Sequence, residues 1–255
     1  MVLNRVYVIP HGDEILDKPN EESKIMFNTI KTYTENDDSP YGVIISPHSV
    51  RLSKGIAIIN TEYLRGTYKL KNGIIRGKYK TFRELNEIIL NNCPDAVELN
   101  FITNKGPLSV FPLDFGSLIP LKFFKFKKIT LIGQPRIDEK EVLKDFGKCL
   151  FRAVEEFPDR ISVIFSADQA HTHSSEGPYG YSEYARYYDQ LVIDSIKGND
   201  FHKLQNLEKS IIESAKPDSY WNMLILASFL DISGRRLNFR YYYVEKYFGM
   251  LFADG

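Results

Sequence analysis

A histidine follows each of three short apolar segments of this chain, and these histidines are the residues best placed to do chemistry. The three are His11, His48 and His171, with His173 two residues beyond the last. The apolar segments cover residues 6–10, 43–47 and 161–165. β-Branched segments of this length are typical of buried strands in an α/β sheet. Ligands gather beyond the carboxyl ends of such strands, so these imidazoles predict a metal or proton-transfer site at one sheet edge.

The composition and the motifs that are missing narrow the classes of function. Lys and Arg together number 33 and so do Asp and Glu, so no basic surplus points to a nucleic-acid partner. The sequence has no G-x-G-x-x-G, Walker P-loop, G-x-S-x-G or zinc-finger spacing. Its apolar stretches are too short to span a bilayer, and acidic residues follow the first one at once. We therefore expect a cytoplasmic protein with no membrane partner.

Two further features bear on redox state and assembly. Cys93 and Cys149 do not form a metal motif, and we expect buried thiols of a cytosolic protein, with a disulfide between them as the alternative. The aromatic segment 239–243 suggests a buried contact between subunits of a homo-oligomer.

Strands and helices alternate along the chain. We expect strands at 5–10, 42–46, 56–70 (with a turn), from 74 onward, 96–102, 109–111, 128–133, 160–167 and 237–244. We expect helices at 24–33, 82–92, 138–157, 182–196, 200–214 and 220–232, and a short one within 113–124. Asn72-Gly73 predicts a hairpin turn, and Thr81 with Glu84 predicts a capping box. This order predicts a single α/β domain over residues 1–255, with a mostly parallel or mixed central sheet flanked by helices.

Each histidine also has an ordinary structural interpretation. His11 precedes Gly12, which allows a ligand to approach closely, but a loop histidine can equally bond to backbone. His171 and His173 are one residue apart, so in an extended segment they point to opposite sides and one of them faces the metal. For His202, on a predicted helix, we favour the ordinary interpretation.

Two histidines and one carboxylate with open coordination positions are typical of non-haem Fe(II) oxygenases. The candidate carboxylates are Asp13, Glu14, Glu176 and Glu245. Glu245 stands out because it lies between aromatic and apolar residues, where an acid needs a partner if it is buried. An ordinary surface charge is the alternative.

Several short motifs occur along the chain in a familiar order. They are Pro-His-Gly-Asp at 10–13, Ser-Pro-His at 46–48, the segment 114–121, Ser-Ala-Asp-Gln-Ala-His at 166–171 with 177–180, and the segment 245–251. With this set the chain resembles the class III extradiol ring-cleavage dioxygenases, in the form of their catalytic B-type subunit, and especially an archaeal-type branch. The ordered set is more specific for the family than for its activity.

The resemblance implies a phosphorylase/hydrolase-like α/β fold that holds one non-haem Fe(II) and acts on a catechol-like aromatic ring with O₂. His11, His48 and Glu245 would be the metal ligands. His171 would take a proton from a catechol hydroxyl and return it later. Residues 13, 168 and 179 (Asp13, Asp168 and Tyr179) are expected to contact the substrate.

One position departs from the family pattern. Phe115 stands where the aromatic-degrading members carry a second pocket histidine, and His173 is the candidate to replace it as a second catalytic residue. This departure favours, as an alternative, a metal-dependent zinc hydrolase or a non-catalytic binding protein on the same scaffold. A purely structural protein with incidental histidines is a third interpretation.

Overall fold

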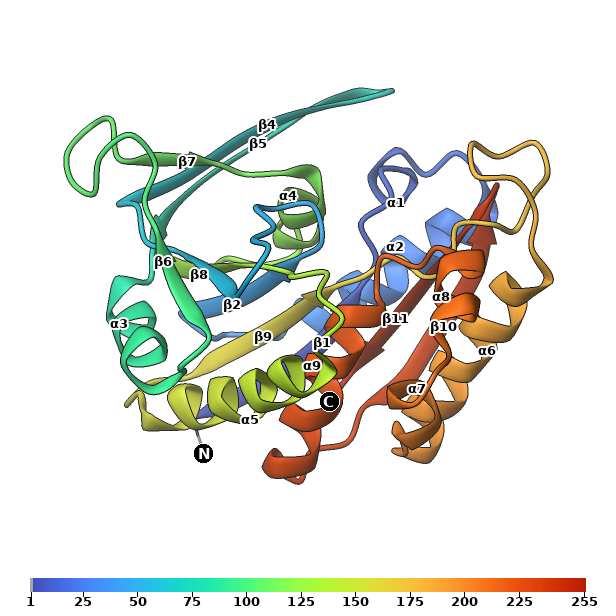
Figure 1. Cartoon of the computed structure of the whole chain (residues 1–255). Coiled ribbons are helices and arrows are strands. Elements are labelled where there is room, and N and C mark those ends of the chain that lie inside the picture. The colour runs from blue at the N-terminus through green and yellow to red at the C-terminus, as the bar shows by residue number, and fades with distance from the viewer. Residues whose placement is uncertain (1) are drawn as a thin grey trace.

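The structure, a computed structural model, describes residues 2–255, and in this part of the chain eleven strands hydrogen-bond into one mixed sheet. The strands are β1 (Leu3–Ile9), β2 (Tyr41–Ser46), β3 (Ile56–Ile59), β4 (Tyr63–Leu70), β5 (Gly73–Thr81), β6 (Ala96–Leu99), β7 (Val110–Pro112), β8 (Lys128–Gly133), β9 (Ile161–Ser166), β10 (Asn238–Glu245) and β11 (Phe248–Asp254). Their order across the sheet is β10-β11-β1-β9-β2-β8-β5-β4-β7 (Figure 1). Strand β3 pairs with β8, and β6 pairs with β3. The predicted α/β fold with a mixed sheet is confirmed.

Four neighbouring strands in the centre of this sheet run parallel. β1 pairs with β9, β9 with β2, and β2 with β8, all in parallel. The register places Ile9 opposite Ser166 and Ser46 opposite Gly133, so these strands end at nearly the same level. The loops that carry the strand-end histidines therefore leave the sheet along one edge.

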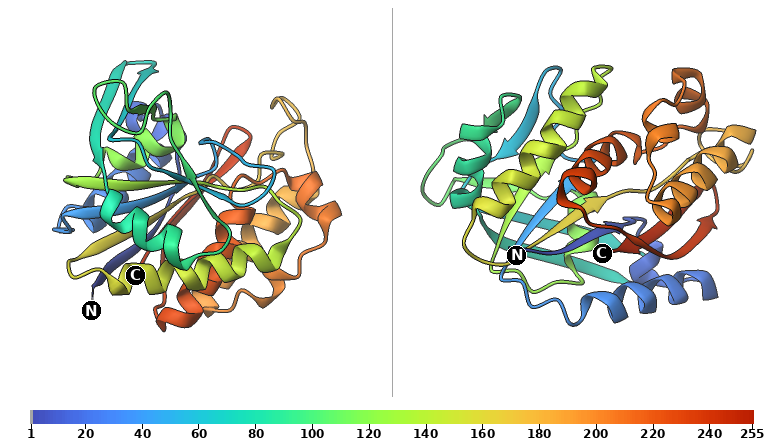
Figure 2. Two further views of the ribbon diagram at one scale, coloured as in Figure 1. Left: turned by 60° about the vertical axis from the view of Figure 1, so that its left-hand side comes forward. Right: turned by 90° about the horizontal axis from the view of Figure 1, so that it is seen from below.

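Helices cover both faces of the sheet. They are α1 (Glu14–Asp17), α2 (Glu21–Thr34), α3 (Arg83–Asn92), α4 (Phe115–Leu121), α5 (Lys140–Glu156), α6 (Glu183–Gly198), α7 (His202–Gln205), α8 (Lys209–Ala215) and α9 (Tyr220–Ser233). The apolar faces of α3, α5, α6 and α9 join one core cluster, whereas α2 and α4 join the other (Figure 2).

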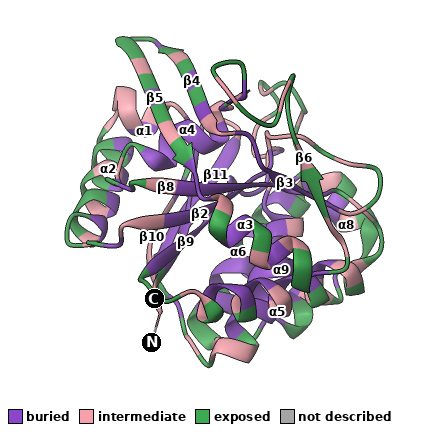
Figure 3. Ribbon diagram, turned by 90° about the vertical axis from the view of Figure 1, so that its left-hand side faces the viewer, coloured by how far each residue is buried: buried purple, intermediate pink, exposed green. Residues whose placement is uncertain are grey.

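Alternating side chains of each strand enter the two clusters. In β1, Val6 and Val8 belong to the first cluster, while Tyr7 and Ile9 belong to the second. Successive side chains of a strand point to opposite faces of the sheet. Because helices cover both faces here, the residues on either face are buried. Figure 3 shows the central strands buried and the exposed residues on the outer faces of the helices and on the β4–β5 hairpin.

The β4–β5 hairpin confirms the turn predicted at Asn72-Gly73. It extends beyond the body of the sheet (Figure 1), and helix α1 supports its tip. The Asp17 carboxylate accepts hydrogen bonds from the backbone N–H groups of Lys71 and Asn72, at 2.8 and 2.9 Å. Two turn donors that would otherwise need water are thus held by the chain itself.

Three local predictions differ from the structure. The helix expected at 200–214 is two helices, α7 and α8, and Lys140 Nζ donates to the carbonyls of Gln205 and Leu207 at the break. The capping box at Thr81 is absent, because Phe82 is the N-cap and Glu84 pairs with Lys128 instead.

The third difference concerns the cysteines. Cys93, at the end of α3, and Cys149, in α5, form a disulfide rather than two free thiols.

None of the helices between residues 2 and 255 combines the length and apolar character that crossing a membrane requires.

At the opposite end of the parallel strands, a half-buried carboxylate connects the first strand to its neighbours. Asp37 Oδ2 accepts hydrogen bonds from the Tyr7 hydroxyl at 3.0 Å and from the Ser162 hydroxyl at 2.6 Å. Its Oδ1 accepts from the Asn4 amide and the Ser39 backbone N–H. Because Tyr7 and Ser162 are fully buried, neither hydroxyl has water as a substitute.

Replacing Asp37 with alanine is expected to lower the free energy of unfolding by about 1–3 kcal/mol, since the buried Tyr7 hydroxyl loses its acceptor and Ser162 keeps only Ser39 as a partner. Urea denaturation measures this change. The neighbouring Asp38→Ala is the control, because the Asp38–Arg160 ion pair is exposed and such pairs contribute about 0–1 kcal/mol. Equal losses for both variants would contradict the role given to Asp37.

Candidate metal centre

The ends of β1 and β2 bring two histidines into contact. His11 Nε2 lies 3.1 Å from His48 Nε2, and the two rings meet edge to face. The His11 side chain is 1% exposed, while that of His48 is 24% exposed. One ligand candidate is thus embedded in the protein, and the other borders a cavity.

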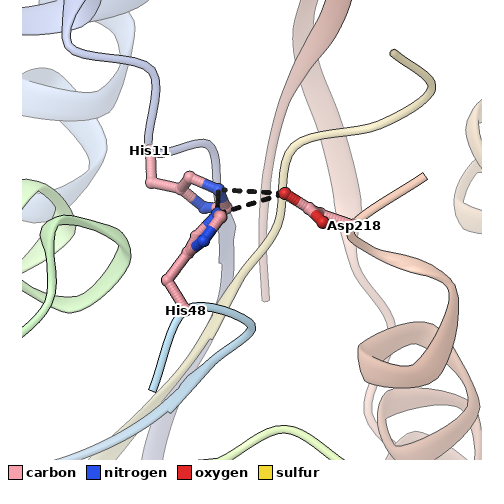
Figure 4. Close-up of side chains that lie close together, drawn as sticks. All are labelled: His11, His48 and Asp218. Atoms are coloured by element: carbon pink, nitrogen blue, oxygen red, sulfur yellow. Dashed lines mark hydrogen bonds and ion pairs between the residues drawn. The ribbon is translucent and has the colours of Figure 1, made fainter. Parts of the chain in front are cut away.

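A carboxylate from a distant part of the chain completes this group. Asp218 Oδ2 lies 3.1 Å from His48 Nε2 and 3.8 Å from His11 Nε2. Within the described residues, these three form a group whose ligand atoms all lie within 4.8 Å of one another (Figure 4). Two imidazoles and one carboxylate are a donor set that suits first-row metals such as Fe(II) and Zn(II).

Asp218 reaches the histidines because the start of α9 is fixed to the strand ends. The buried Asn222 amide, in the first turn of α9, donates to the carbonyls of Ile45 and Ser166. Gln134, which directly follows β8, donates to the Asp218 carbonyl at 2.8 Å. Arg136 pairs with Asp218 Oδ1. That pairing leaves Oδ2 as the oxygen directed at the histidines.

The surroundings of His11 select the tautomer that a metal ligand needs. Ser166 Oγ donates to the Gly116 carbonyl, so it accepts from His11 Nδ1, which lies 2.9 Å away. The proton of a neutral His11 ring then sits on Nδ1, and the Nε2 lone pair faces His48 and Asp218. A hydrogen bond to the second ring nitrogen is the usual means of orienting a ligating histidine.

The charges of this group depend on one another. Burial by itself lowers the pKa of the His11 imidazole, but the Asp168 and Asp218 carboxylates outweigh it and hold that pKa above its ordinary value. Burial also favours the neutral form of Asp218, yet hydrogen bonds with His11 and His48 hold the pKa of this carboxyl well below its usual range. The buried carboxylates thus require positive charge between them, which a divalent cation supplies. The residues present fit a metal ion.

His171 lies beside the group and has a free ring nitrogen. Its Nε2 is 3.7 Å from Asp218 Oδ2, and its ring stacks on Phe248. The backbone N–H of His171 donates to the Ala215 carbonyl, which fixes the loop after β9. The buried Nδ1 has no hydrogen-bond partner among the described residues. Because Nδ1 is buried, Nε2 is the nitrogen that can exchange a proton with a molecule bound in the cavities that His171 lines.

Comparison with known proteins places this geometry in a family. Residues 6–251 match the family described as the catalytic LigB subunit of aromatic ring-opening dioxygenase. The chain belongs to this LigB family. Protein CA_C1420 of Clostridium acetobutylicum is 26% identical over 232 residues, which cover 84% of this chain and 49% of that protein. The chain therefore spans about half the length of this curated relative.

A solved structure shares the fold. The crystal structure of the uncharacterized protein JW3007 from Escherichia coli K12 superposes with a TM-score of 0.66, and the match covers 98% of both chains. The sequence identity is 14%, so this similarity concerns the fold alone. The family match over residues 6–251 confirms the resemblance to the catalytic subunit of the ring-cleavage dioxygenases, whereas the archaeal-type branch stays a prediction.

The LigB-family chain does not bring every residue predicted from the sequence to the site. Glu245 ends β10, and its carboxylate accepts from the Asn20 amide at 2.8 Å, apart from the group of His11, His48 and Asp218. Strand β11 lies between β10 and β1, which separates Glu245 from His11. Asp218 stands in the place expected for Glu245.

His173 points away from the metal centre. Its Nε2 lies 2.8 Å from Asp189 Oδ2, which also accepts from the Tyr242 hydroxyl. Asp189 Oδ1 accepts from the backbone N–H of Ala170. His173 therefore helps to fasten the loop that carries His171, and it does not occupy the position of a second pocket histidine.

The residues expected to contact substrate lie at different depths. Asp168 is 4% exposed and lines the smaller cavity, and its Oδ1 accepts from the backbone N–H of His11, so it also supports a ligand candidate. Tyr179 is half exposed at the mouth of the site, with its ring 6.0 Å from that of His171. Asp13 lines the cavity beside His11, and burial together with Glu14 raises its pKa to about 6.

Two cavities meet at the metal centre. The smaller has a volume of about 360 Å³ and includes Phe115, whose ring centre lies 4.1 Å from that of His48. The larger has a volume of about 710 Å³. His48, His171, Tyr179 and Asp218 border both.

Gly12 shows why the strand-end loop needs its small residue. A Cβ at this position would lie 2.9 Å from Met250 Sδ and 2.9 Å from the Phe248 ring. The close approach is between β1's loop and β11, not between backbone and ligand. The sequence interpretation of Gly12 as space for a ligand is thus replaced by a packing reason.

Three functional residues were not anticipated from the sequence: Asp218, Gln134 and Arg136. Asp218 precedes a predicted helix, where an acidic residue is ordinary, so its type and position carry no special signal. Gln134 and Arg136 do carry a signal in the sequence. They follow the predicted strand 128–133, just as His11 and His48 follow their predicted strands.

Replacing Asp218 with asparagine is expected to weaken Fe(II) or Zn(II) binding more than about tenfold, since the ligand set loses its anionic oxygen. Metal titration of the purified protein, followed by elemental analysis, measures the effect. Glu245→Gln makes the same chemical change outside the group and should retain full affinity. A loss for Glu245→Gln with no loss for Asp218→Asn would reverse the assignment.

Proposed function

We propose that this chain is an Fe(II)-dependent extradiol-type dioxygenase, which opens the ring of a catechol-like aromatic compound with O₂, and that residues 1–255 form one catalytic domain. The observation that carries the proposal is the group of His11, His48 and Asp218, open to a cavity, in a member of a ring-opening family. This donor set is the one that non-haem Fe(II) oxygenases use.

The site residues divide into ligands and a proton carrier. His11, His48 and Asp218 would hold Fe(II), which supplies Lewis acidity and the redox chemistry that O₂ activation needs. His171 Nε2 accepts the proton of a substrate hydroxyl and returns it at a later stage. Asp218 Oδ2 lies 3.7 Å from this nitrogen.

The smaller cavity suits a flat ring. Phe115 packs nearly parallel to Tyr68, with ring centres 5.6 Å apart, and Tyr247 and Phe248 line the same space. These aromatic walls orient a planar substrate through ring stacking and keep water away from the reacting edge. Tyr179, at the mouth, and Asp13, on the floor, are the polar groups that would contact its substituents.

Phe115 also supports a second candidate. Its apolar ring fills the position beside His48 where a second pocket histidine was expected, so a polar group for handling O₂ is lacking there. A zinc-dependent hydrolase or a non-catalytic binding protein has no need of that group. Oxygen uptake distinguishes the candidates, because a hydrolase consumes none.

Anaerobic reconstitution with Fe(II), followed by exposure to O₂ and a panel of catechols, tests the proposal. We expect equal consumption of O₂ and catechol and the appearance of a yellow ring-opened product. Zn(II) binding without O₂ uptake from any catechol would instead favour the second candidate.

Replacing His171 with glutamine is expected to lower kcat about a hundredfold or more, while the metal content stays at the wild-type level. Steady-state O₂ uptake measures the rate, and elemental analysis measures the metal. His202→Gln is the matched control, because His202 is an exposed residue of α7 outside both cavities. An unchanged kcat in His171→Gln would remove this residue from proton transfer.

A further inference from the structure

The larger cavity offers more space than a single aromatic ring needs. The smaller cavity, at about 360 Å³, already provides the aromatic slot beside the metal centre. The larger one, at about 710 Å³, has the size of pockets that enclose a whole small-molecule ligand. Because His48, His171 and Asp218 border both, a molecule whose ring lies in the slot extends directly into this second space.

The larger cavity carries an excess of positive charge. Five cationic side chains line it: Arg51, Arg136, Lys140, Lys209 and Lys216. Three carboxylates line it as well: Asp138, Glu213 and Asp218. The chain as a whole has no net charge, so this excess is a local feature of the cavity.

Two of the cations are neutralised by ion pairs. Arg136 pairs with Asp218, and Lys209 Nζ lies 2.8 Å from Asp138 at the exposed rim. Among the described residues, the cavity's ion pairs leave Arg51, Lys140 and Lys216 without a carboxylate partner, and Lys140 Nζ donates to the carbonyls of Gln205 and Leu207. Glu213 is the remaining carboxylate of the cavity, so the three cations exceed it by two positive charges, which favours an anion of more than one charge.

Arg51 is held in place for this role. Its Nε and Nη2 both donate to the Pro47 carbonyl, at 3.1 and 2.7 Å, and Pro47 precedes the ligand candidate His48. These two bonds hold the guanidinium against the loop that carries His48, and Arg51 is an exposed residue that lines the larger cavity. Burial and the nearby Arg136 lower the pKa of Arg51, as expected for two cations that share a space.

The same cavity has aromatic walls that would hold the connecting part of a ligand. Lys216 Nζ lies 5.7 Å from the centre of the Tyr179 ring, and Lys140 Nζ lies 5.7 Å from that of Tyr220. The cations are thus spread over aromatic surfaces, which keeps them close to the cavity.

We propose that the substrate carries, beside its ring, a substituent with at least two negative charges, such as a phosphate, and that Arg51, Lys140 and Lys216 bind this substituent in the larger cavity. The position of the ring rests on the proposed function. The recognition of the dianion does not, because it requires neither metal nor turnover.

Four catechols test the proposal, each with a different group at the same ring position: a phosphonate, a malonate, a single carboxylate or a hydroxymethyl group. Calorimetry on the metal-free protein at mildly alkaline pH gives each Kd. We expect the phosphonate to bind about tenfold or more tightly than the neutral hydroxymethyl compound, and this advantage to shrink as salt is raised. Comparable binding of the malonate would show that two carboxylates serve as well as a phosphate.

Two variants assign the effect to the cavity. Arg51→Gln and Lys216→Gln should each weaken phosphonate binding about tenfold and leave hydroxymethyl binding unchanged. Arg76→Gln, on the exposed strand β5, removes one cation elsewhere and should change neither. Two separate cavity variants keep the test sound if one of them fails to fold.

The outcomes separate this inference from the proposed function. Equal affinity for all four catechols, or the same loss in Arg76→Gln as in Arg51→Gln, would overturn the dianion site. A charge preference without any O₂ uptake would support the dianion site and count against the dioxygenase. Ring opening of the neutral compound without any charge preference would support the dioxygenase and count against the dianion site.

Discussion

The metal centre depends on how helix α9 is fixed to the ends of two parallel strands. The Asn222 amide donates to the carbonyls of Ile45 and Ser166, the last residues or nearly so of β2 and β9. Asn222 is fully buried, so these bonds have no competition from water. These bonds hold the start of α9 against the ends of the strands. Asp218 lies two residues before α9 and is thereby placed beside both histidines.

Buried charge is the second constraint on the site. His11 lies within 3.8 Å of both Asp168 and Asp218, and hardly any of its surface reaches solvent. Charges in such an interior are stable only when they are balanced. A divalent cation would meet this demand for the whole group, in agreement with the donor set and with the tautomer of His11.

In this LigB-family chain the candidate metal centre lies between two cavities of different character. One is a narrow aromatic slot that contains Phe115, and the other is a wide basic cavity that begins at Arg51. The two histidines follow strands of the central sheet, whereas the cations of the wide cavity come from loops, from the start of α5, and from α8 and the residue after it. In the proposed function, chemistry and substrate choice would therefore be carried by different parts of the molecule, as is usual where binding residues lie on loops of a rigid scaffold.

Local patterns in the sequence determined the buried strands, the α/β class and the strand-end positions of His11, His48 and His171, because these follow from hydrophobic periodicity and from the geometry of parallel strands. Tertiary structure alone decided which carboxylate joins the histidines. Glu245 and Asp218 are both acids next to apolar elements, and the choice depends on strand order: β11 separates Glu245 from His11, while α9 is anchored at the ends of β2 and β9. Neither the order of strands across a sheet nor such long-range hydrogen bonds is encoded in local spacing, so no reading of adjacent residues could reveal them.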